Sequence, residues 1–128
     1  MKSIVLFLML TALPLTSIFG AEVYGTITER GKPIKEGLEV QVFKMPKEPK
    51  ERPIFIINTK TQKNGSYSIV VKEKGEFLLR LILPPNSYPR SKDSKEQNPG
   101  IAINSYNYSV RYNLILERSD GEYRLRRK

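Results

Sequence analysis

The amino-acid sequence predicts an all-β protein, a seven-stranded antiparallel β-sandwich. Apolar residues recur at every second position in one segment after another, and a period of two is typical of half-buried strands rather than helices. Turn-forming pairs such as Asn64-Gly65 and Asp120-Gly121 divide these segments at short intervals. No strand-like segment is followed by a helical pattern, so alternating β and α units are not expected.

The first two expected strands span residues 22–30 and 38–43, and a turn at residues 30–33 separates them. In both strands, apolar side chains alternate with polar or aromatic ones, which places one face toward a core. Gly25 interrupts the first strand. A glycine at such a position indicates a β-bulge or the close approach of another backbone segment.

Residues 58–71 predict a β-hairpin centred on Asn64-Gly65, preceded by β-forming residues from position 54. This dipeptide can adopt the two positive φ angles of a type I′ turn, whose twist matches that of the flanking strands. After the turn, alternate side chains are apolar and are expected to face the core: Tyr67, Ile69 and Val71. Val70 is an apolar exception on the outer side of this strand.

Three further strands complete the set of seven. Residues 77–83 are apolar on both faces except for Arg80, which predicts a central strand ended by Pro84-Pro85. Residues 105–117 alternate over their whole length, and residues 123–126 form a short last strand. The expected inward face of the 105–117 strand comprises Tyr106, Tyr108, Val110, Tyr112, Leu114 and Leu116.

Two polar stretches are expected to be exposed loops. Residues 44–53 contain three prolines and six charged residues, and they can bury almost no apolar surface. Residues 86–100 are also polar and mixed in charge. The first loop is expected to be a connector, with a docking arm for a partner as the alternative.

Residues 1–20 are expected to be a cleavable signal peptide that precedes a domain at residues 21–128. Lys2 is followed by an apolar run that is too short for a transmembrane span, and Gly20 provides a small residue before the expected cleavage site. Cleavage after Ser17 or Ala21 is an alternative. Because the sequence has no cysteine, it has no lipobox, and we expect a secreted or periplasmic protein without a transmembrane span in the mature chain.

Residues 23–83 resemble the carboxypeptidase regulatory-like domain of the transthyretin-like (prealbumin-like) sandwiches. The matching stretches are Tyr24-Gly25-Thr26-Ile27, Gly31-Lys32-Pro33-Ile34, Gly37-Leu38-Glu39-Val40-Gln41-Val42, Asn64-Gly65-Ser66-Tyr67 and Lys74-Gly75-Glu76-Phe77. The sequence departs from this family at Lys74, where proline is frequent, and in its two long polar loops. The resemblance implies a Greek-key sandwich and a non-catalytic accessory, adhesion or spacer role on exported proteins.

The residue types argue against an enzyme. The sequence contains no histidine and no cysteine, which removes the usual general bases, the Ser/His and Cys/His nucleophile pairs and the preferred zinc ligands. One transthyretin-like branch hydrolyses a purine intermediate with histidines that this chain lacks. We expect no catalytic residues, no cofactor and no metal, so the expected function is a non-enzymatic binding or scaffold module of the bacterial cell envelope.

A basic surface is the main functional feature that the residues indicate. The net charge of the full chain is +9, which favours an envelope protein or an anionic surface as partner. No nucleic-acid ligand is expected. One basic area, exposed on an outer sheet face or edge, is expected from Arg80, Arg111, Arg118, Arg124, Arg126, Arg127 and Lys128. Charges at a sheet edge also block aggregation, and this protective role is the alternative to docking.

The tyrosines suggest a second possible function. Aromatic rings can stack on the apolar face of a sugar, so a carbohydrate-binding module is the alternative hypothesis. It requires that some of five rings lie exposed and coplanar: Tyr24, Tyr88, Tyr106, Tyr108 and Tyr112. The shared face of Tyr106, Tyr108 and Tyr112 with leucines and valine favours a core role instead.

Overall fold

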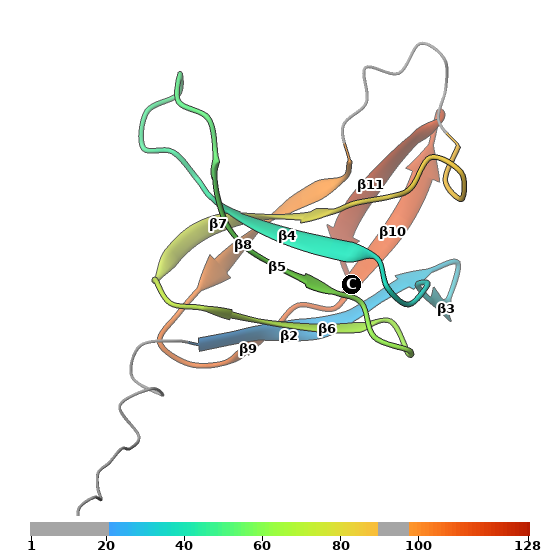
Figure 1. The fold of residues 1–128 in the computed structure, drawn as a ribbon, viewed down its shortest axis with the longest axis horizontal. Helices are drawn as coiled ribbons and strands as arrows, with labels where there is room; N and C mark the ends of the chain where they lie inside the picture. Colours follow the sequence, from blue (N-terminus) through green and yellow to red (C-terminus); the bar gives the residue numbers. More distant parts are fainter. Residues whose placement is uncertain (1–20, 90–97) are drawn as a thin grey trace, which may run out of the picture.

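The computed structural model describes residues 21–89 and 98–128. The expected signal peptide, and residues 90–97 of the expected second polar loop, therefore lie outside the described residues. The described chain is all-β and contains ten strands rather than seven (Figure 1). They are β2 (Ala21–Glu29), β3 (Lys32–Pro33), β4 (Glu39–Lys44), β5 (Ile54–Lys60), β6 (Ser66–Val71), β7 (Gly75–Leu81), β8 (Gly100–Ser105), β9 (Val110–Arg111), β10 (Leu114–Ser119) and β11 (Glu122–Arg127).

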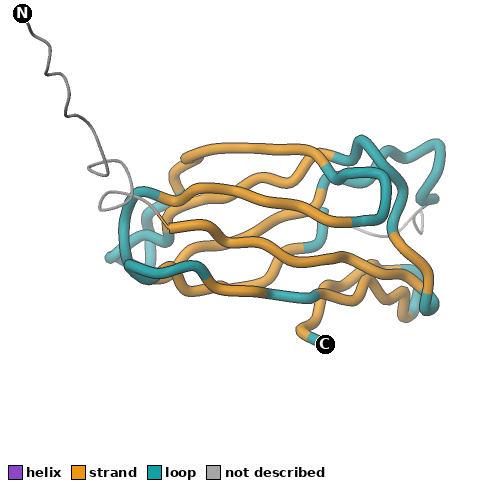
Figure 2. The backbone as a smooth tube through the Cα atoms, turned by 90° about the horizontal axis from the view of Figure 1, so that it is seen from below, coloured by secondary structure: helices purple, strands orange, loops and turns teal. Residues whose placement is uncertain are grey.

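The strands form two sheets. In the four-stranded sheet the order is β5-β4-β7-β8, and every neighbouring pair is antiparallel. In the six-stranded sheet β2 is central: β3 and β6 pair with it in antiparallel fashion, β9 and β10 pair with it in parallel, and β11 completes the sheet beside β10. The expectation of a purely antiparallel sandwich was therefore wrong at the β2–β9 and β2–β10 pairs. Strands run along the long axis, and most loops gather at its two ends (Figure 2).

The core lies between the two sheets and follows the predicted alternation. Its largest fully buried side chains are Tyr67, Phe77, Ile27, Leu79, Leu81, Leu83, Ile103, Leu114 and Leu116. Burial of an aliphatic side chain stabilises a fold by about 1.5–3 kcal/mol, so a core of this kind can hold a domain that has no disulfide. The prediction that the segment from Phe77 forms a central strand is confirmed, because β7 pairs with both β4 and β8. Among the described residues, no helix is long and apolar enough to cross a membrane.

The predicted hairpin at residues 58–71 was wrong in its pairing. A turn is present, because the Gly65 N–H donates to the Gln62 carbonyl at 2.9 Å, but β5 pairs with β4 whereas β6 pairs with β2. Only Gly65 has a positive φ, of 78°, so the turn is not type I′. Buried Thr61 accounts for the divergence: its hydroxyl accepts from the Leu38 N–H and donates to the Lys35 carbonyl, which anchors the end of β5 beside β4.

The expected single strand at residues 105–117 is divided among two sheets. β8 ends at Ser105 in the four-stranded sheet, and the chain then crosses to β9 and β10 in the six-stranded sheet. Tyr106 and Tyr108 lie in this crossing and are 39% and 60% exposed, so the prediction that they belong to the core was wrong. Apolar and polar residues alternate through the crossing as they do in the strands, so the sequence pattern does not reveal the change of sheet.

Gly25 permits an unusually close approach between two backbone segments. A Cβ atom at this position would lie 2.1 Å from the carbonyl oxygen of Tyr112, which is far inside any van der Waals contact. Just beside it, the Thr26 N–H donates to Oδ1 of Asn113 at 3.1 Å, so a side chain replaces the backbone acceptor between β9 and β10. The prediction of a close backbone approach at Gly25 is confirmed.

Tyr112 connects this contact to both sheets. Its carbonyl accepts a 2.6 Å hydrogen bond from the buried hydroxyl of Tyr67 on β6. Its own hydroxyl accepts from the Asn104 N–H at 2.9 Å and donates to the Asn104 carbonyl at 3.1 Å, on β8 in the other sheet. A single buried tyrosine thus links β6, the β9–β10 junction and β8.

Replacement of Gly25 by alanine should destabilise the protein strongly. The new methyl group must displace the Tyr112 backbone, and overpacking of this kind costs about 3 kcal/mol. Gly31→Ala is the matched control, because Gly31 has open space around it and only its positive φ of 78° opposes a side chain. The control should cost about 1 kcal/mol. Urea denaturation measures both values, and equal losses would show that the Gly25 contact is not tight.

Replacement of Tyr67 by phenylalanine should change both stability and its dependence on pH. Loss of the buried hydrogen bond to Tyr112 should cost about 1–2 kcal/mol at neutral pH. Burial, with a smaller contribution from Tyr112, raises the pKa of Tyr67 above its usual value of 10.0. The stability that the protonated hydroxyl contributes is therefore complete below pH 10 and falls as the pH rises further, because the unfolded chain then releases the proton more readily.

Denaturation curves between neutral pH and pH 11 should show a shallower alkaline loss for Tyr67→Phe than for the unaltered chain. Tyr108→Phe is the control, since it removes a hydroxyl from an exposed ring and should leave the curve unchanged. Identical alkaline slopes for all three proteins would contradict the role given to Tyr67.

Candidate functional site

The outer face of β10 and β11 carries charge, and its composition follows from the pairing of these strands. Inward positions hold Leu114, Leu116, Tyr123 and Leu125, all of them buried. Outward positions pair Ile115 with Arg126 and Glu117 with Arg124. Period-two alternation thus separates an apolar inner face from a basic outer face.

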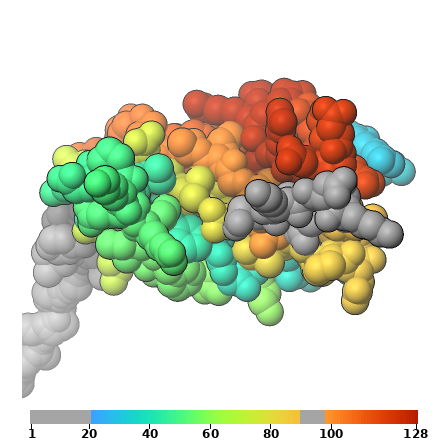
Figure 3. Space-filling model, turned by 90° about the horizontal axis from the view of Figure 1, so that it is seen from above, coloured from blue at the N-terminus to red at the C-terminus, as the bar shows by residue number. Residues whose placement is uncertain are grey.

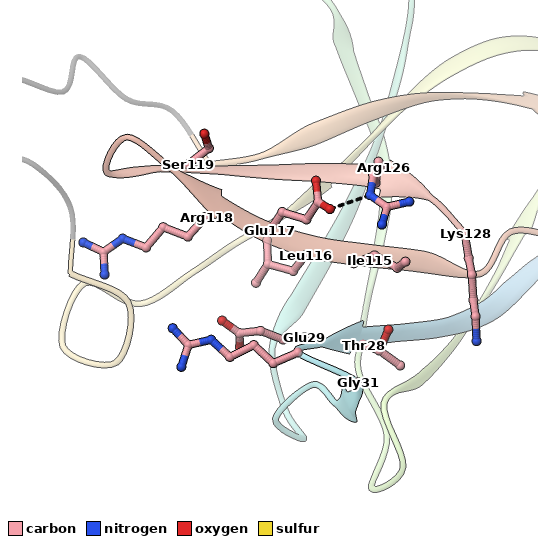
Figure 4. Close-up of a pocket in the computed structure, with 11 residues that line it drawn as sticks. Thr28, Glu29, Gly31, Ile115, Leu116, Glu117, Arg118, Ser119, Arg126 and Lys128 are labelled. Atoms are coloured by element: carbon pink, nitrogen blue, oxygen red, sulfur yellow. Dashed lines mark hydrogen bonds and ion pairs between the residues drawn. The ribbon is translucent and has the colours of Figure 1, made fainter.

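A cavity of about 710 Å³ opens between this face and the turn that joins β2 to β3. Four basic residues line it: Arg30, Arg118, Arg126 and Lys128, which we call the basic groove. Glu29 and Glu117 also line it, so its basic residues outnumber its acidic ones. Figure 4 shows Arg118 at one end of the basic groove and Arg126 with Lys128 at the other.

Ion pairs neutralise part of this positive charge. Arg126 Nε lies 2.5 Å from a Glu117 carboxylate oxygen, and Arg124 lies 3.6 Å from Glu122. Both pairs are exposed, where such contacts contribute at most about 1 kcal/mol. Within the described residues, the side chains of Arg30, Arg118 and Lys128 form no ion pair. These three cations are therefore the part of the basic groove that is available to an anion.

Aromatic rings position two of the arginines. The Arg118 guanidinium carbon lies 5.5 Å from the ring centroid of Tyr123, and that of Arg127 lies 4.6 Å from the ring of Tyr112. Tyr88 packs edge-to-face against Tyr123, with ring centroids 5.6 Å apart. Burial, followed by the charge of Glu29 and the proximity of Tyr123, raises the pKa of Tyr88, so its hydroxyl stays protonated at neutral pH.

A second cavity of about 640 Å³ adjoins the basic groove. The two share Glu29, Arg30 and Arg118, and the second adds Lys32 together with Tyr88 and Tyr123. Arg30 comes from the β2–β3 turn and Lys32 from β3, and neither was among the predicted site residues. They enter the site because β10 pairs with β2 in parallel, a neighbour relation that alternation along one strand does not reveal.

The structure brings together only part of the predicted basic area. Arg118, Arg126 and Lys128 line the basic groove, Arg124 lies beside it on β11, and Arg127 lies over Tyr112. The other two predicted members lie elsewhere. Arg111 is exposed on β9, with its guanidinium 5.2 Å from the Tyr24 ring, and Arg80 is on β7 in the opposite sheet.

Arg80 also departs from its predicted exposure. Its side chain is half-buried rather than solvent-exposed, because its guanidinium lies 5.1 Å from the ring centroid of Phe43 on the outer face of the four-stranded sheet. Its Nε is buried without a hydrogen-bond partner among the described residues. Arg80 therefore does not contribute to the basic groove.

The five tyrosines proposed for glycan contact fall into three groups. Tyr88 and Tyr112 are buried, so their rings are not available to a sugar. Tyr24 is half-buried, with Arg111 above its ring. Tyr106 and Tyr108 are exposed, but they stack on each other with centroids 5.1 Å apart and an interplanar angle of 5°. Each ring of this pair has only its outer face free, so the two do not form a broad flat surface on which a glycan could stack.

The described residues contain no group of three acidic side chains that could hold a metal ion. Arginine and lysine around the basic groove can instead hold an anion through charge-assisted hydrogen bonds. A planar guanidinium such as that of Arg118 suits carboxylate or phosphate oxygens, and the ammonium of Lys128 adds a mobile point charge.

No family model matches the sequence, and no curated protein is significantly similar to it. The fold does resemble solved structures. The crystal structure of a DUF3823 family protein from Parabacteroides merdae ATCC 43184 is 15% identical, with a TM-score of 0.50 over 79% of this chain and 49% of that chain. (S)-allantoin synthase is 11% identical, with a TM-score of 0.53 over 88% of this chain and 45% of that chain.

The chain thus spans about half the length of each of these two structures. At such low identity the likeness concerns the fold alone. It supports an all-β sandwich architecture that also occurs in a bacterial protein.

Proposed function

We propose that this chain is an exported, non-enzymatic binding or scaffold module of the bacterial cell envelope, which docks through the basic groove to an anionic surface. One observation carries the proposal. Arg30 comes from the β2–β3 turn, whereas Arg118 and Lys128 come from the β10–β11 hairpin and the residue after it; all three line one cavity and form no ion pair within the described residues. Cations gathered in this way attract anionic groups and shorten their search for the site.

Binding accounts for this site better than catalysis does. Its polar side chains are arginine, lysine, glutamate, serine and threonine, and the sequence contains neither histidine nor cysteine. General acid–base catalysis at neutral pH needs a group whose pKa lies near the operating pH. Histidine, the side chain whose ordinary pKa lies in that range, is absent from the sequence.

Export and domain type belong to the same proposal. The apolar run after Lys2 and the small Gly20 support a signal peptide at residues 1–20, followed by one domain at residues 21–128. The resemblance of residues 23–83 to carboxypeptidase regulatory-like, transthyretin-like sandwiches supports an accessory module on exported proteins. The two-sheet architecture is compatible with that assignment.

Vesicle binding tests the docking role. Residues 21–128 should sediment with phosphatidylcholine vesicles that contain phosphatidylglycerol, and not with phosphatidylcholine alone. The triple variant Arg30→Gln, Arg118→Gln, Lys128→Gln should bind about tenfold more weakly or worse, because each cation near an anionic membrane contributes about 1 kcal/mol before salt screening.

A matched variant separates the basic groove from net charge. Lys47→Gln, Lys50→Gln, Arg52→Gln removes the same number of exposed positive charges from the loop between β4 and β5. It should retain most of the binding. Equal losses in both variants, or no binding at physiological salt, would contradict docking through the basic groove and leave edge protection as the role of these charges.

A carbohydrate-binding module is the second candidate, and it is supported by the exposed Tyr106–Tyr108 pair. A stacked aromatic pair can cover one face of a sugar ring. Binding on a glycan array that is lost in Tyr106→Ala, Tyr108→Ala, with the fold retained, would support this function. Unchanged binding by that variant would exclude a role for the pair.

A further inference from the structure

The two sheets end in edges of opposite character. The last strand, β11, and the residue after it carry Arg124, Arg126, Arg127 and Lys128, which protect an edge from unwanted pairing. In contrast, β5 begins with three exposed apolar side chains: Ile54, Phe55 and Ile56 are 60%, 49% and 40% exposed. The C-terminal strands and the start of β5 lie on well-separated parts of the surface (Figure 3).

Among the residues that the structure describes, β5 has a strand on one side only. It pairs with β4 and is the outermost strand of its sheet, and β6 likewise pairs with β2 alone within the described residues. Between these two edges lies a groove of about 400 Å³, lined by Ile56, Ile57, Val70, Val71, Lys72 and Glu73. We call it the β5–β6 groove. The outward Val70, an apolar exception in the alternation of β6, is 50% exposed and forms part of its wall.

A bulge in β5 turns apolar side chains toward this groove. Ile57 pairs with Val42 and Phe55 pairs with Phe43, so Ile56 is an extra residue without a partner in β4. Phe55 packs edge-to-face on Phe43, with centroids 5.7 Å apart. The bulge leaves Ile56 and Ile57 both lining the β5–β6 groove, where they form an apolar strip beside Val70.

The outer side of β5 also offers backbone hydrogen-bonding groups. The Thr61 N–H donates to the Leu38 carbonyl, in register with the β4–β5 ladder. Because alternate residues of an antiparallel strand direct their N–H groups to opposite sides, those of Asn58 and Lys60 are directed away from β4. An added strand could pair with these groups and place alternate side chains in the β5–β6 groove.

The charge around β5 favours one kind of added strand over another. Residues 44–74, which carry both open edges, contain eight lysines and arginines and three glutamates. Antiparallel pairing of β5 with a second copy would bring Arg52 of one chain toward Lys60 and Lys63 of the other, and like charges placed in this way are destabilising. A strand with acidic residues at its ends would meet complementary charge instead.

We propose that β5 and the β5–β6 groove bind an extended segment of a partner protein by β-strand addition, and that this segment is apolar at alternate positions and acidic at its ends. Backbone pairing would supply affinity, and the apolar strip would select the side chains. This inference does not depend on the basic groove, which shares no lining residue with the β5–β6 groove and takes a different ligand.

A fluorescent synthetic peptide tests the proposal directly. Its sequence alternates valine and threonine and has aspartates at both ends, and a second peptide has lysines in place of the aspartates. Fluorescence anisotropy with residues 21–128 should show saturable binding of the acidic peptide and at least tenfold weaker binding of the basic one. Binding of neither peptide, or equal binding of both, would overturn the proposal.

A pair of variants at one position isolates the backbone contact. Asn58→Pro and Asn58→Ala both remove the side-chain amide that donates to Glu39, but only proline removes the outward N–H. Alanine should leave peptide binding nearly unchanged, and proline should weaken it about tenfold through the lost hydrogen bond and the bulk of its ring. Equal binding by the two folded variants would overturn strand addition.

A second variant covers the case in which Asn58→Pro does not fold. Ile56→Thr, Val70→Thr changes two exposed side chains without touching the backbone, and it should weaken peptide binding several-fold while the melting temperature is retained. Unchanged binding by this variant would overturn the role of the apolar strip. Sedimentation should show the free protein as a monomer, and a dimer lost in Asn58→Pro would assign the β5 edge to a second copy instead.

Discussion

The contact between Gly25 and the Tyr112 backbone determines how β9 and β10 meet β2. Only a residue without a Cβ allows β9 and β10 to run beside β2 at this distance, and the Tyr112 side chain then reaches β8 in the opposite sheet. The same approach places β10 next to the β2–β3 turn, which brings Arg118 into one cavity with Arg30. The basic groove is thus a consequence of the parallel pairing, because residues distant in sequence supply its cations.

The arrangement also explains why two edge strands, β11 and β5, can serve different purposes. The contact between Gly25 and Tyr112 holds β10 beside β2, and β11 therefore forms one border of the six-stranded sheet. On the other side of β2 lies β6. Residues that discourage strand pairing are concentrated on β11, whereas β5 presents apolar side chains. A protein that binds an anionic surface through the basic groove and an extended segment through the β5 edge could bridge the two, which suits the proposed scaffold module.

The individual strands could be predicted from the sequence more readily than their partners. Alternation located β2, β4, β6 and β7, and Gly25 was identified as a site of close approach, because burial on one face leaves a local pattern. Pairing is decided by distant contacts. Thr61 keeps β5 beside β4, and the crossing after Ser105 changes sheets while the alternation continues, so neither event is visible locally. The place of Arg30 in the basic groove was missed for the same reason, because it depends on the pairing of β10 with β2.

Native-state hydrogen exchange of the individual backbone amides tests most directly whether the contact between Gly25 and Tyr112 organises this fold. The Tyr112 N–H, which donates to the Tyr24 carbonyl at 2.8 Å, and the Thr26 N–H should be among the slowest to exchange, with protection close to that of global unfolding. The outward amides of Asn58 and Lys60 should exchange rapidly. Fast exchange at Tyr112 and Thr26 would contradict the central role of the contact between Gly25 and Tyr112. Slow exchange along the outer side of β5 would contradict an unpaired edge there.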